Sequence, residues 1–408
     1  MSQRSKKVVV VGGGHAGVEF CAALRERDYS ASVCLVNGDT VYPYERPPLS
    51  KSYLAGETSL DRHRLRPPTF YDQREIELLL GTKAERIERA SRQIVLSDGQ
   101  SLHYDALVLA LGAKPRQFLA PGIASVDAHY LHDAAQATRL SEAMEYGARL
   151  LICGGGFIGL EVAATATKRG LCVTLVEQKD RLLERVAPEP VSMVFHNLHR
   201  HHGVDVVLGR TISEFRQGNQ AVLSDQSVIA FDILLIGVGS LPNVDLAVRA
   251  ELAASQYGIP VDRFMRTVDP NIYAIGDCAI QHQSPTETRV RIESVDNAIQ
   301  QARVAAGDIC GTQDVVAEVP WFWSSQYDHQ LQIAGTYAPS NPCPVKVSTP
   351  DRLLAFQHRG GRMEAVFGVN AAAEVQAGRR LIATGKSMPE DVLANSELPL
   401  RAILKEMA

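Results

Sequence analysis

Apolar positions along the chain form two copies of a strand–helix–strand pattern. Each copy opens with a short apolar run typical of a buried strand, continues into a helical stretch and ends in a second apolar run. Strands and helices that alternate in this order are typical of an α/β fold. The predicted strand, helix and strand span 7–11, 18–27 and 32–36 in the first copy, and 150–152, 157–169 and 172–177 in the second.

The rest of the chain carries shorter and more varied patterns. The predicted strands lie near 77–80, 92–96, 102–109, 204–208, 221–223 and 233–237, with a hairpin turn at 97–100. The stretch 297–309 predicts a helix, whereas the proline-rich segment 41–51 predicts no regular structure. From Pro320 onward the pattern alternates as in an antiparallel sheet and finishes in a short helix near 379–384.

Both copies carry a glycine-rich turn between the first strand and the helix. The turns read Gly12-Gly-Gly14-His-Ala16-Gly17 and Gly154-Gly-Gly156-Phe157-Ile158-Gly159. In this pattern the first glycine makes the tight turn, the second lets the backbone approach a pyrophosphate, and the third lets the helix pack closely on the strand. The pyrophosphate then lies at the positive end of the helix. Two such motifs predict two bound dinucleotides.

Three acidic residues follow predicted strands at places suited to nucleotide hydroxyls. Asp39 lies just past the second strand of the first copy, and Asp277 lies at the carboxyl end of a strand predicted within 268–277. Glu177 ends the corresponding strand of the second copy, where an acid binds ribose hydroxyls and repels a 2′-phosphate. Glu177 therefore predicts NADH rather than NADPH. The nearby cations that argue against this choice are Lys179, Arg181 and Arg185.

Length and composition narrow the class of protein. A chain of 408 residues is expected to hold two or three domains, and its 45% hydrophobic and 22% charged residues are those of a globular protein. The formal net charge of −4 gives no general attraction to nucleic acid or anionic membranes. No apolar stretch approaches the roughly 20 residues that span a bilayer, and the first residues form no apolar signal region. We therefore expect a cytoplasmic protein without nucleic-acid or membrane partners.

Six local motifs occur in order along the whole chain. They are the first glycine motif, Pro47-Pro-Leu-Ser-Lys51, Gly154-Gly-Gly-Phe-Ile-Gly-Leu-Glu161, Tyr273-Ala-Ile-Gly-Asp277, Arg291-Ile-Glu-Ser-Val295 and Pro320-Trp-Phe-Trp-Ser324. Together they resemble the FAD-dependent, NADH-using ferredoxin reductases of bacterial oxygenase systems. The resemblance implies two Rossmann-like dinucleotide-binding domains of the glutathione-reductase type and a C-terminal α+β sheet domain. The implied domains are a discontinuous FAD domain at 1–114 and 241–317, an NADH domain at 115–240 and the C-terminal domain at 318–408.

The resemblance also implies which residues hold the cofactors. The implied FAD contacts are Gly12, Gly14, Ala16, Gly17, Asp39, Arg46, Lys51, Ala84, Asp277 and Val295. The expected NADH contacts are Gly154, Gly156, Phe157, Ile158, Gly159, Glu177, Arg185 and Gly239. Lys51 and Glu161 are implied to pair beside the flavin and the nicotinamide. The helix that begins near Val295 is expected to direct its positive end at the flavin pyrimidine ring.

The electron acceptor implied by the resemblance is a small acidic 2Fe–2S ferredoxin that feeds a monooxygenase or a Rieske dioxygenase. Its candidate docking residues are Arg64, Arg66 and Arg303. Three positions depart from the family pattern: Leu111 replaces a threonine, His132 an arginine and Ser325 an aspartate. Trp321 and Trp323 predict core aromatics of the C-terminal sheet, although the family places this motif near the flavin edge.

Other classes of flavoprotein share this fold. A disulfide reductase of the glutathione-reductase type needs a cysteine pair after the first strand–helix–strand unit. The chain has seven cysteines but none between Asn37 and Leu60, so electrons are expected to leave singly. A rubredoxin reductase is a further alternative. A redox-sensing protein resembling apoptosis-inducing factor would use the same Lys51–Glu161 pair, but we expect it to carry a targeting presequence and a basic surface.

Four histidines at the end of the helix predicted before residue 204 raise the question of a metal site. They are His196, His199, His201 and His202. No acid or cysteine lies at ligand spacing from them. The sequence therefore predicts a solvated helix end and no bound metal.

Overall fold

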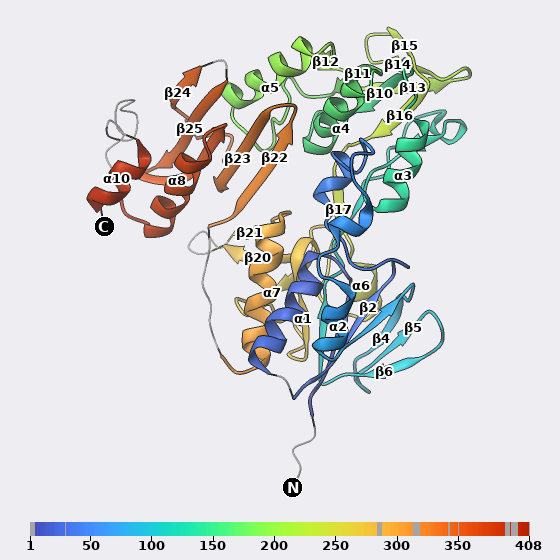
Figure 1. The fold of residues 1–408 in the computed structure, drawn as a ribbon, viewed down its shortest axis with the longest axis vertical. Helices are drawn as coiled ribbons and strands as arrows, with labels where there is room; N and C mark the ends of the chain where they lie inside the picture. Colours follow the sequence, from blue (N-terminus) through green and yellow to red (C-terminus); the bar gives the residue numbers. More distant parts are fainter. Residues whose placement is uncertain are drawn as a thin grey trace. The chain divides into compact units, whose positions relative to one another are not determined.

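The chain folds into two compact units in the computed structural model, which describes residues 5–28, 30–283, 288–312, 319–341, 343–349, 351–387, 392 and 399–407 (Figure 1). Unit 1 contains Met1–Arg46, Ser59–Lys114 and Ser240–Glu318. Unit 2 contains Pro47–Thr58, Pro115–Gly239 and Val319–Ala408. Unit 1 resumes at Ser240, next to the boundary expected at 240/241 between the NADH domain and the second part of the FAD domain. The division into three domains stays a prediction, because unit 2 holds both the NADH and the C-terminal segments.

Unit 1 is built around a parallel sheet of five strands in the order β19-β7-β1-β2-β3. The strands are β1 (Lys7–Val11), β2 (Ser32–Asn37), β3 (Ile76–Leu80), β7 (Ala106–Leu109) and β19 (Ile272–Ala274). The inner strands β1 and β7 are almost wholly buried, as expected for a parallel sheet covered on both faces. Helices α1 (His15–Arg27) and α7 (Val295–Ile309) lie side by side in this unit (Figure 1).

Smaller elements complete unit 1. One small sheet is antiparallel and contains β4 (Ala84–Glu88), β5 (Gln93–Leu96) and β6 (Ser101–His103), and another contains β18 (Ile259–Val261), β20 (Ala279–Gln283) and β21 (Thr288–Val290). Strands β8 (Ala113–Pro115) and β17 (Ser240–Pro242) form a pair. The remaining elements are helices α2 (Pro68–Gln73) and α6 (Asp245–Arg249) and the 3-10 turns η2 (Leu60–His63) and η4 (Gly276–Cys278). The single strand predicted over 102–109 is wrong. The chain leaves the antiparallel sheet at Tyr104, whose N–H donates to Arg92, and joins the parallel sheet after Asp105, whose N–H donates to Lys7.

Unit 2 contains a second parallel sheet in the order β12-β11-β10-β16-β9. Its strands are β9 (Ala128–His129), β10 (Arg149–Cys153), β11 (Cys172–Glu177), β12 (Asp205–Leu208) and β16 (Ile233–Ile236), with helices α3 (Ala134–Ala143), α4 (Phe157–Lys168) and α5 (Glu189–His201). The same unit also contains a small antiparallel sheet, β13 (Ile212–Arg216), β14 (Gln220–Leu223) and β15 (Val228–Ala230), and the 3-10 turn η3 (Ile123–Ser125). The predicted strand–helix–strand copy is thus present with nearly the predicted bounds.

The C-terminal part of unit 2 is an antiparallel sheet in the order β22-β23-β26-β25-β24. Its strands are β22 (Trp321–Gln326), β23 (His329–Gly335), β24 (Val345–Thr349), β25 (Arg352–Arg359) and β26 (Arg362–Val369), and helices α8 (Ala372–Thr384) and α10 (Leu400–Met407) follow. The predicted short helix near 379–384 was therefore too short and was not the last one. Helix α8 begins earlier because Val375, Gly378 and Leu381 form one buried face, on which Gly378 packs against Val366 of β26.

The proline-rich segment also differs from its prediction. Residues Pro47–Ser50 form a 3-10 turn, η1, and belong to unit 2. Proline fits the first positions of a helical turn because its φ is already near −65°. An N–H at these positions would have no acceptor within the turn, so its absence in proline costs no hydrogen bond. Within the described ranges, no helix is long and apolar enough to cross a membrane.

Candidate active site

The first glycine motif has the geometry of a dinucleotide cradle. Gly12 has φ +112°, and a Cβ there would lie 2.2 Å from the Ala110 carbonyl oxygen. A Cβ on Gly17 would lie 2.0 Å from the carbonyl oxygen of Gly12, so helix α1 can approach β1 only without a side chain here. A Cβ on Gly14 would meet nothing within 4 Å. The turn therefore leaves open space where α1 begins, beside N–H groups suited to a pyrophosphate.

The second motif repeats this geometry in unit 2. Gly154 has φ +110°, and a Cβ there would lie 2.4 Å from the Gly237 carbonyl oxygen. A Cβ on Gly159 would lie 2.1 Å from the carbonyl oxygen of Gly154, whereas one on Gly156 would meet nothing within 4 Å. Phe157 and Ile158 are the first residues of α4. Each unit therefore carries one cradle that fits a dinucleotide.

Other predicted flavin contacts lie in unit 1 together with the first cradle. Asp39, just past β2, pairs with Arg46 at 3.4 Å and accepts a hydrogen bond from the Tyr44 hydroxyl. Ala84 is the first residue of β4. His15, the first residue of α1, was not predicted as a site residue, although it lies inside the motif. Burial, and next the Arg46 guanidinium, lower the pKa of His15 to about 4, so its imidazole is neutral at pH 7.

Asp277 lies in the turn η4 directly after β19, at the carboxyl end of the parallel sheet of unit 1. Burial, and next the Glu293 carboxylate, raise the pKa of Asp277 to about 7, against the opposing effect of Arg291. The side chain of Asp277 makes no hydrogen bond to any described residue, so both carboxylate oxygens can accept hydroxyl groups of a ligand. Val295 begins α7 as predicted, and Ser294 caps this helix by accepting from the Asn297 N–H.

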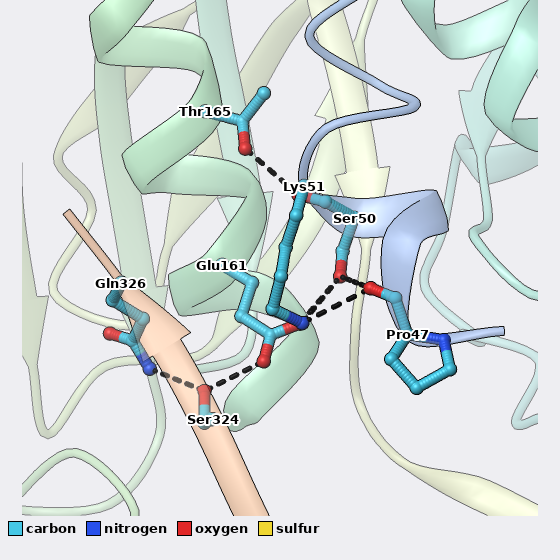
Figure 2. A network of polar contacts seen from close by, with 7 residues as sticks. All are labelled: Pro47, Ser50, Lys51, Glu161, Thr165, Ser324 and Gln326. Atoms are coloured by element: carbon cyan, nitrogen blue, oxygen red, sulfur yellow. Dashed lines mark hydrogen bonds and ion pairs between the residues drawn. The ribbon is translucent and has the colours of Figure 1, made fainter. Parts of the chain in front are cut away.

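Lys51 and Glu161 meet in unit 2, where they form an ion pair of 2.5 Å (Figure 2). Glu161 lies on the second turn of α4 and is only 4% exposed. Its Oε2 also accepts from the Ser50 hydroxyl at 2.5 Å, and its Oε1 accepts from the Ser324 hydroxyl at 2.6 Å. Lys51 donates to the carbonyl oxygen of Pro47 at 3.1 Å. The carboxylate is thus held on both oxygens, and the sequence did not identify Ser50 or Ser324 as partners.

The carboxylate of Glu177 is fixed at the end of β11, beside the second cradle. Its Oε2 accepts from the Gly155 N–H at 2.6 Å and its Oε1 from the Lys179 N–H at 2.8 Å. Arg181, a possible phosphate ligand, donates instead to the carbonyl oxygens of Ala187 and Glu184 and to two hydroxyls. Arg185 is exposed, and a Cβ on Gly239 would lie 4.0 Å from its guanidinium. Arg181 is therefore occupied and does not favour a 2′-phosphate.

The structure corrects two predictions about aromatic and histidine residues. Trp321 and Trp323 are half-buried rather than fully buried in the core, and Trp321 packs against the hydrophobic cluster of the C-terminal sheet. Their rings stack at 4.8 Å between centroids, and with Ser325 they line a cavity of about 220 Å³. His199 is fully buried rather than solvated, and its Nε2 is bound to Gln326 Oε1 at 2.8 Å. Across the part of the chain that the structure describes, no three potential ligands are grouped to hold a metal ion.

The other family departures lie near backbone contacts. Leu111 offers its carbonyl oxygen to the Asn243 side chain at 2.8 Å, a bond that does not depend on the side chain at 111. His132 is half-buried and lies just before α3. The predicted docking arginines of unit 1 are paired: Arg66 and Arg303 both contact Glu19, at 3.2 Å and 2.8 Å, and Arg64 contacts Asp61.

The seven cysteines are all free thiols. Burial raises the pKa of Cys21 to about 12, and burial followed by Glu77 raises that of Cys34 to about 12, so neither is a thiolate at neutral pH. The segment after β2, where a disulfide reductase carries its cysteine pair, contains none. The thiols therefore offer no redox-active disulfide.

Comparison with known proteins agrees with this geometry. A family model described as pyridine nucleotide-disulphide oxidoreductase matches residues 6–302, and one described as reductase C-terminal matches residues 321–404. The chain is 37% identical to rhodocoxin reductase of Rhodococcus erythropolis, over 97% of this chain and 93% of that protein. It is 38% identical to putidaredoxin reductase of Pseudomonas putida, over 97% and 96% of the two proteins.

A solved structure also shows similarity to a reductase of this kind. The covalent putidaredoxin reductase–putidaredoxin complex matches with a TM-score of 0.95 and 37% identity, over 99% of both chains. The fold and both cradles define a two-dinucleotide flavoprotein oxidoreductase. The chain belongs to the pyridine nucleotide-disulphide oxidoreductase family and, within it, to the ferredoxin reductases of oxygenase systems, which confirms the resemblance found in the sequence.

Proposed function

We infer that this protein is an FAD flavoprotein that takes a hydride from NADH and passes the electrons singly to a 2Fe–2S ferredoxin of an oxygenase system. The observation that carries this proposal is the presence of two dinucleotide cradles in a chain whose cysteines form no redox disulfide. The relatives named after rhodocoxin, putidaredoxin and ferredoxin support an iron–sulphur protein as the acceptor. We also propose that the protein works in the cytoplasm, where NADH is supplied.

FAD is assigned to unit 1 on the fit of its residues. The open space at Gly14 and the start of α1 accept the pyrophosphate, with Ala16 and Gly17 in the first helical turn. The carboxylate of Asp277, which makes no hydrogen bond to any described residue, accepts hydrogen bonds from the ribityl hydroxyls. Asp39 and Arg46 supply a negative and a positive side chain near the end of β2 for the adenosine part of FAD. The remaining contacts proposed for FAD are Gly12, Lys51, Ala84 and Val295.

NADH is assigned to unit 2 by the same reasoning. The cradle Gly154–Gly159 and the start of α4, at Phe157 and Ile158, receive its pyrophosphate. Glu177 is held by two backbone N–H groups at the end of β11, the place where an acid accepts hydrogen bonds from a ribose diol in this fold. Arg185 and Gly239 complete the proposed contacts. Glu161 lies on the same helix as the cradle, one turn beyond it, where it can position the nicotinamide.

The bound flavin supplies the redox chemistry, because it accepts two electrons as a hydride and releases them one at a time. The protein supplies geometry and electrostatics. Lys51 and the buried Glu161 form an ion pair whose other partners are fixed, so neither side chain must reorganise when the nicotinamide arrives. Because Glu161 is buried, water has little access to its carboxylate.

Replacing Glu177 should weaken the preference for NADH over NADPH. Glu177→Ala removes two hydrogen bonds to the ribose and the repulsion of a 2′-phosphate, together about 2–3 kcal/mol. The ratio of kcat/KM for NADH to that for NADPH should therefore fall by roughly one to two decades. Glu177→Gln keeps one oxygen acceptor and should lie between the two, while Glu189→Ala, an exposed glutamate at the start of α5, should keep the wild-type ratio. Equal use of both cofactors by the wild-type protein would refute the ribose assignment.

The function itself is tested by turnover with a purified 2Fe–2S ferredoxin. The protein with NADH should reduce the ferredoxin in many turnovers, and typical enzymes of this kind work at about 1–1000 per second. Glutathione disulfide and rubredoxin serve as competing acceptors. Faster turnover with either of them, or a flavin that NADH reduces without any transfer to ferredoxin, would replace this proposal with a disulfide or rubredoxin reductase, or with a redox sensor.

A further inference from the structure

The buried contacts of Glu161 continue beyond its two serine partners into a chain of hydrogen bonds within unit 2. Ser324 donates to Glu161 Oε1 at 2.6 Å, and Gln326 donates from Nε2 to Ser324 Oγ at 3.1 Å (Figure 2). The Oε1 of Gln326 is bound to His199 Nε2 at 2.8 Å. Ser324, Gln326 and His199 are at most 1% exposed, so water does not compete for these bonds.

This chain of hydrogen bonds forms because β22 runs alongside α4, and two residues of the strand cover nearly the same length as four residues of the helix. Two residues of a strand rise about 6.6 Å, and four residues of a helix rise about 6 Å. The tilted ring of Phe322 therefore packs against that of Phe157, with 4.3 Å between their centroids. Two residues later along β22, Ser324 meets Glu161, which lies four residues after Phe157 on the helix. Further along, the Tyr327 hydroxyl bonds that of Thr167 at 2.9 Å. Glu161 thus receives its partner from a strand more than 150 residues away in sequence.

The direction of each hydrogen bond is fixed by chemistry. Burial, the largest cause, lowers the pKa of His199 to about 4, so its ring is neutral at pH 7. Since a carbonyl oxygen only accepts, Nε2 of His199 must carry the proton and donate it to Gln326. The amide N–H of Gln326 then faces Ser324, whose oxygen accepts it. The single hydroxyl hydrogen of Ser324 remains for Glu161.

We propose that Ser324, Gln326 and His199 are positioning residues that hold Glu161 in the orientation needed for reduction of the flavin by NADH. This inference rests on the proposed function. His199 favours the observed orientation of the Gln326 amide, because the turned amide would donate to Nε2 and move the ring proton to Nδ1, which has no hydrogen-bond partner among the described residues. In the turned orientation Gln326 Oε1 would face Ser324 and compete with Glu161 for the hydroxyl hydrogen. If Gln326 took this hydrogen, Oε1 of the buried Glu161 carboxylate would lose its donor.

The first test measures flavin reduction by stopped flow over a range of NADH concentrations. Loss of one hydrogen bond to a charged group should slow reduction at saturating NADH about tenfold in Ser324→Ala, with the apparent dissociation constant for NADH changed less than about twofold. Ser324→Thr keeps the hydroxyl and should restore most of the rate. His199→Phe should slow reduction, whereas His199→Gln, which keeps a donor near the Nε2 position, should not. Ser325→Ala makes the same change on the opposite face of β22 and should match the wild-type rate.

The second test needs no turnover. Urea unfolding of the holoprotein should show that Ser324→Ala lowers the midpoint in the wild-type background and much less in the Glu161→Ala background, because Glu161→Ala has already removed the acceptor of the Ser324 hydroxyl. Additive effects, or a wild-type reduction rate in Ser324→Ala, would overturn the proposal, as would equal slowing by Ser325→Ala. If NADH failed to reduce the wild-type flavin, the proposed function would fail, while coupled unfolding midpoints would still establish the contact.

Discussion

Asp277→Ala protein should be purified mostly without flavin, with less than about a tenth of the wild-type FAD content. The carboxylate lies at the carboxyl end of β19 and makes no hydrogen bond to the described residues, so its acceptors are available to the ribityl hydroxyls. Hydrogen bonds to a charged group contribute about 1.5–3 kcal/mol each, and two of them correspond to at least a hundredfold in affinity. The measurement is the ratio of flavin absorbance to protein absorbance after purification.

The same substitution should have the opposite effect on the flavin-free protein. The pKa of Asp277 is raised to about 7 by burial, so the folded state disfavours the ionised form. The resulting destabilisation is absent below the unfolded pKa of about 3.9 and grows as pH rises toward 7, to at most about 4 kcal/mol. Flavin-free Asp277→Ala should therefore unfold at a higher temperature than flavin-free wild type at pH 8, with no difference near pH 4.

Two controls separate binding from folding. Asp277→Asn keeps one oxygen acceptor and should retain more FAD than Asp277→Ala. Asp98→Ala, in the exposed hairpin between β5 and β6, should keep full occupancy. Full flavin occupancy in Asp277→Ala would remove Asp277 from the site, and low occupancy together with a lower unfolding temperature of the flavin-free protein would indicate a structural role instead.

The elements that the sequence predicted well are those whose signal is local. The bounds of β1 and β11 were predicted to the residue, because continuous apolar runs between turns mark buried parallel strands. The glycine motifs predicted both cradles for a similar reason: the first and third glycine of each motif lie where the nearby backbone leaves no room for a Cβ, and a Cβ at the position between them would meet nothing within 4 Å. Strand β4 was missed because three of its five residues, in Ala84-Glu-Arg-Ile-Glu88, are charged and it has one fully buried position.

The site depends on contacts that no local pattern encodes. Lys51 and Glu161 were paired only through the family resemblance, since 110 positions separate them. Ser324 belongs to a motif that the sequence singled out for its tryptophans, yet its hydroxyl contacts Glu161. His199 was expected in solvent because it stands among histidines and an arginine, but its position on α5 faces Gln326. Such partners follow from the packing of β22, which the sequence does not specify.

We propose that Arg66 and Arg303 steer an acidic ferredoxin toward the protein, so reversing both charges together should reduce ferredoxin-dependent kcat/KM by about two decades or more. Both guanidinium groups contact the carboxylate of Glu19, so two positive charges and one negative leave a net charge of +1 in this cluster. The double variant changes that charge to −3. Reduction of ferricyanide should stay near the wild-type rate, because a small acceptor needs no docking surface.

The shared carboxylate gives a sharper test than the reversal alone. Glu19→Gln raises the charge of the cluster from +1 to +2 and frees both arginines, so ferredoxin reduction should become faster at low ionic strength. That gain should vanish as salt shortens the Debye length from about 10 Å at 0.1 M to about 3 Å at 1 M. Arg139→Glu with Arg210→Glu reverses two surface arginines of unit 2 and makes the same total change in charge. If this control slows ferredoxin reduction as strongly as the Arg66 and Arg303 pair, net charge rather than a defined docking surface governs the encounter. If neither double variant slows it, the acceptor docks elsewhere.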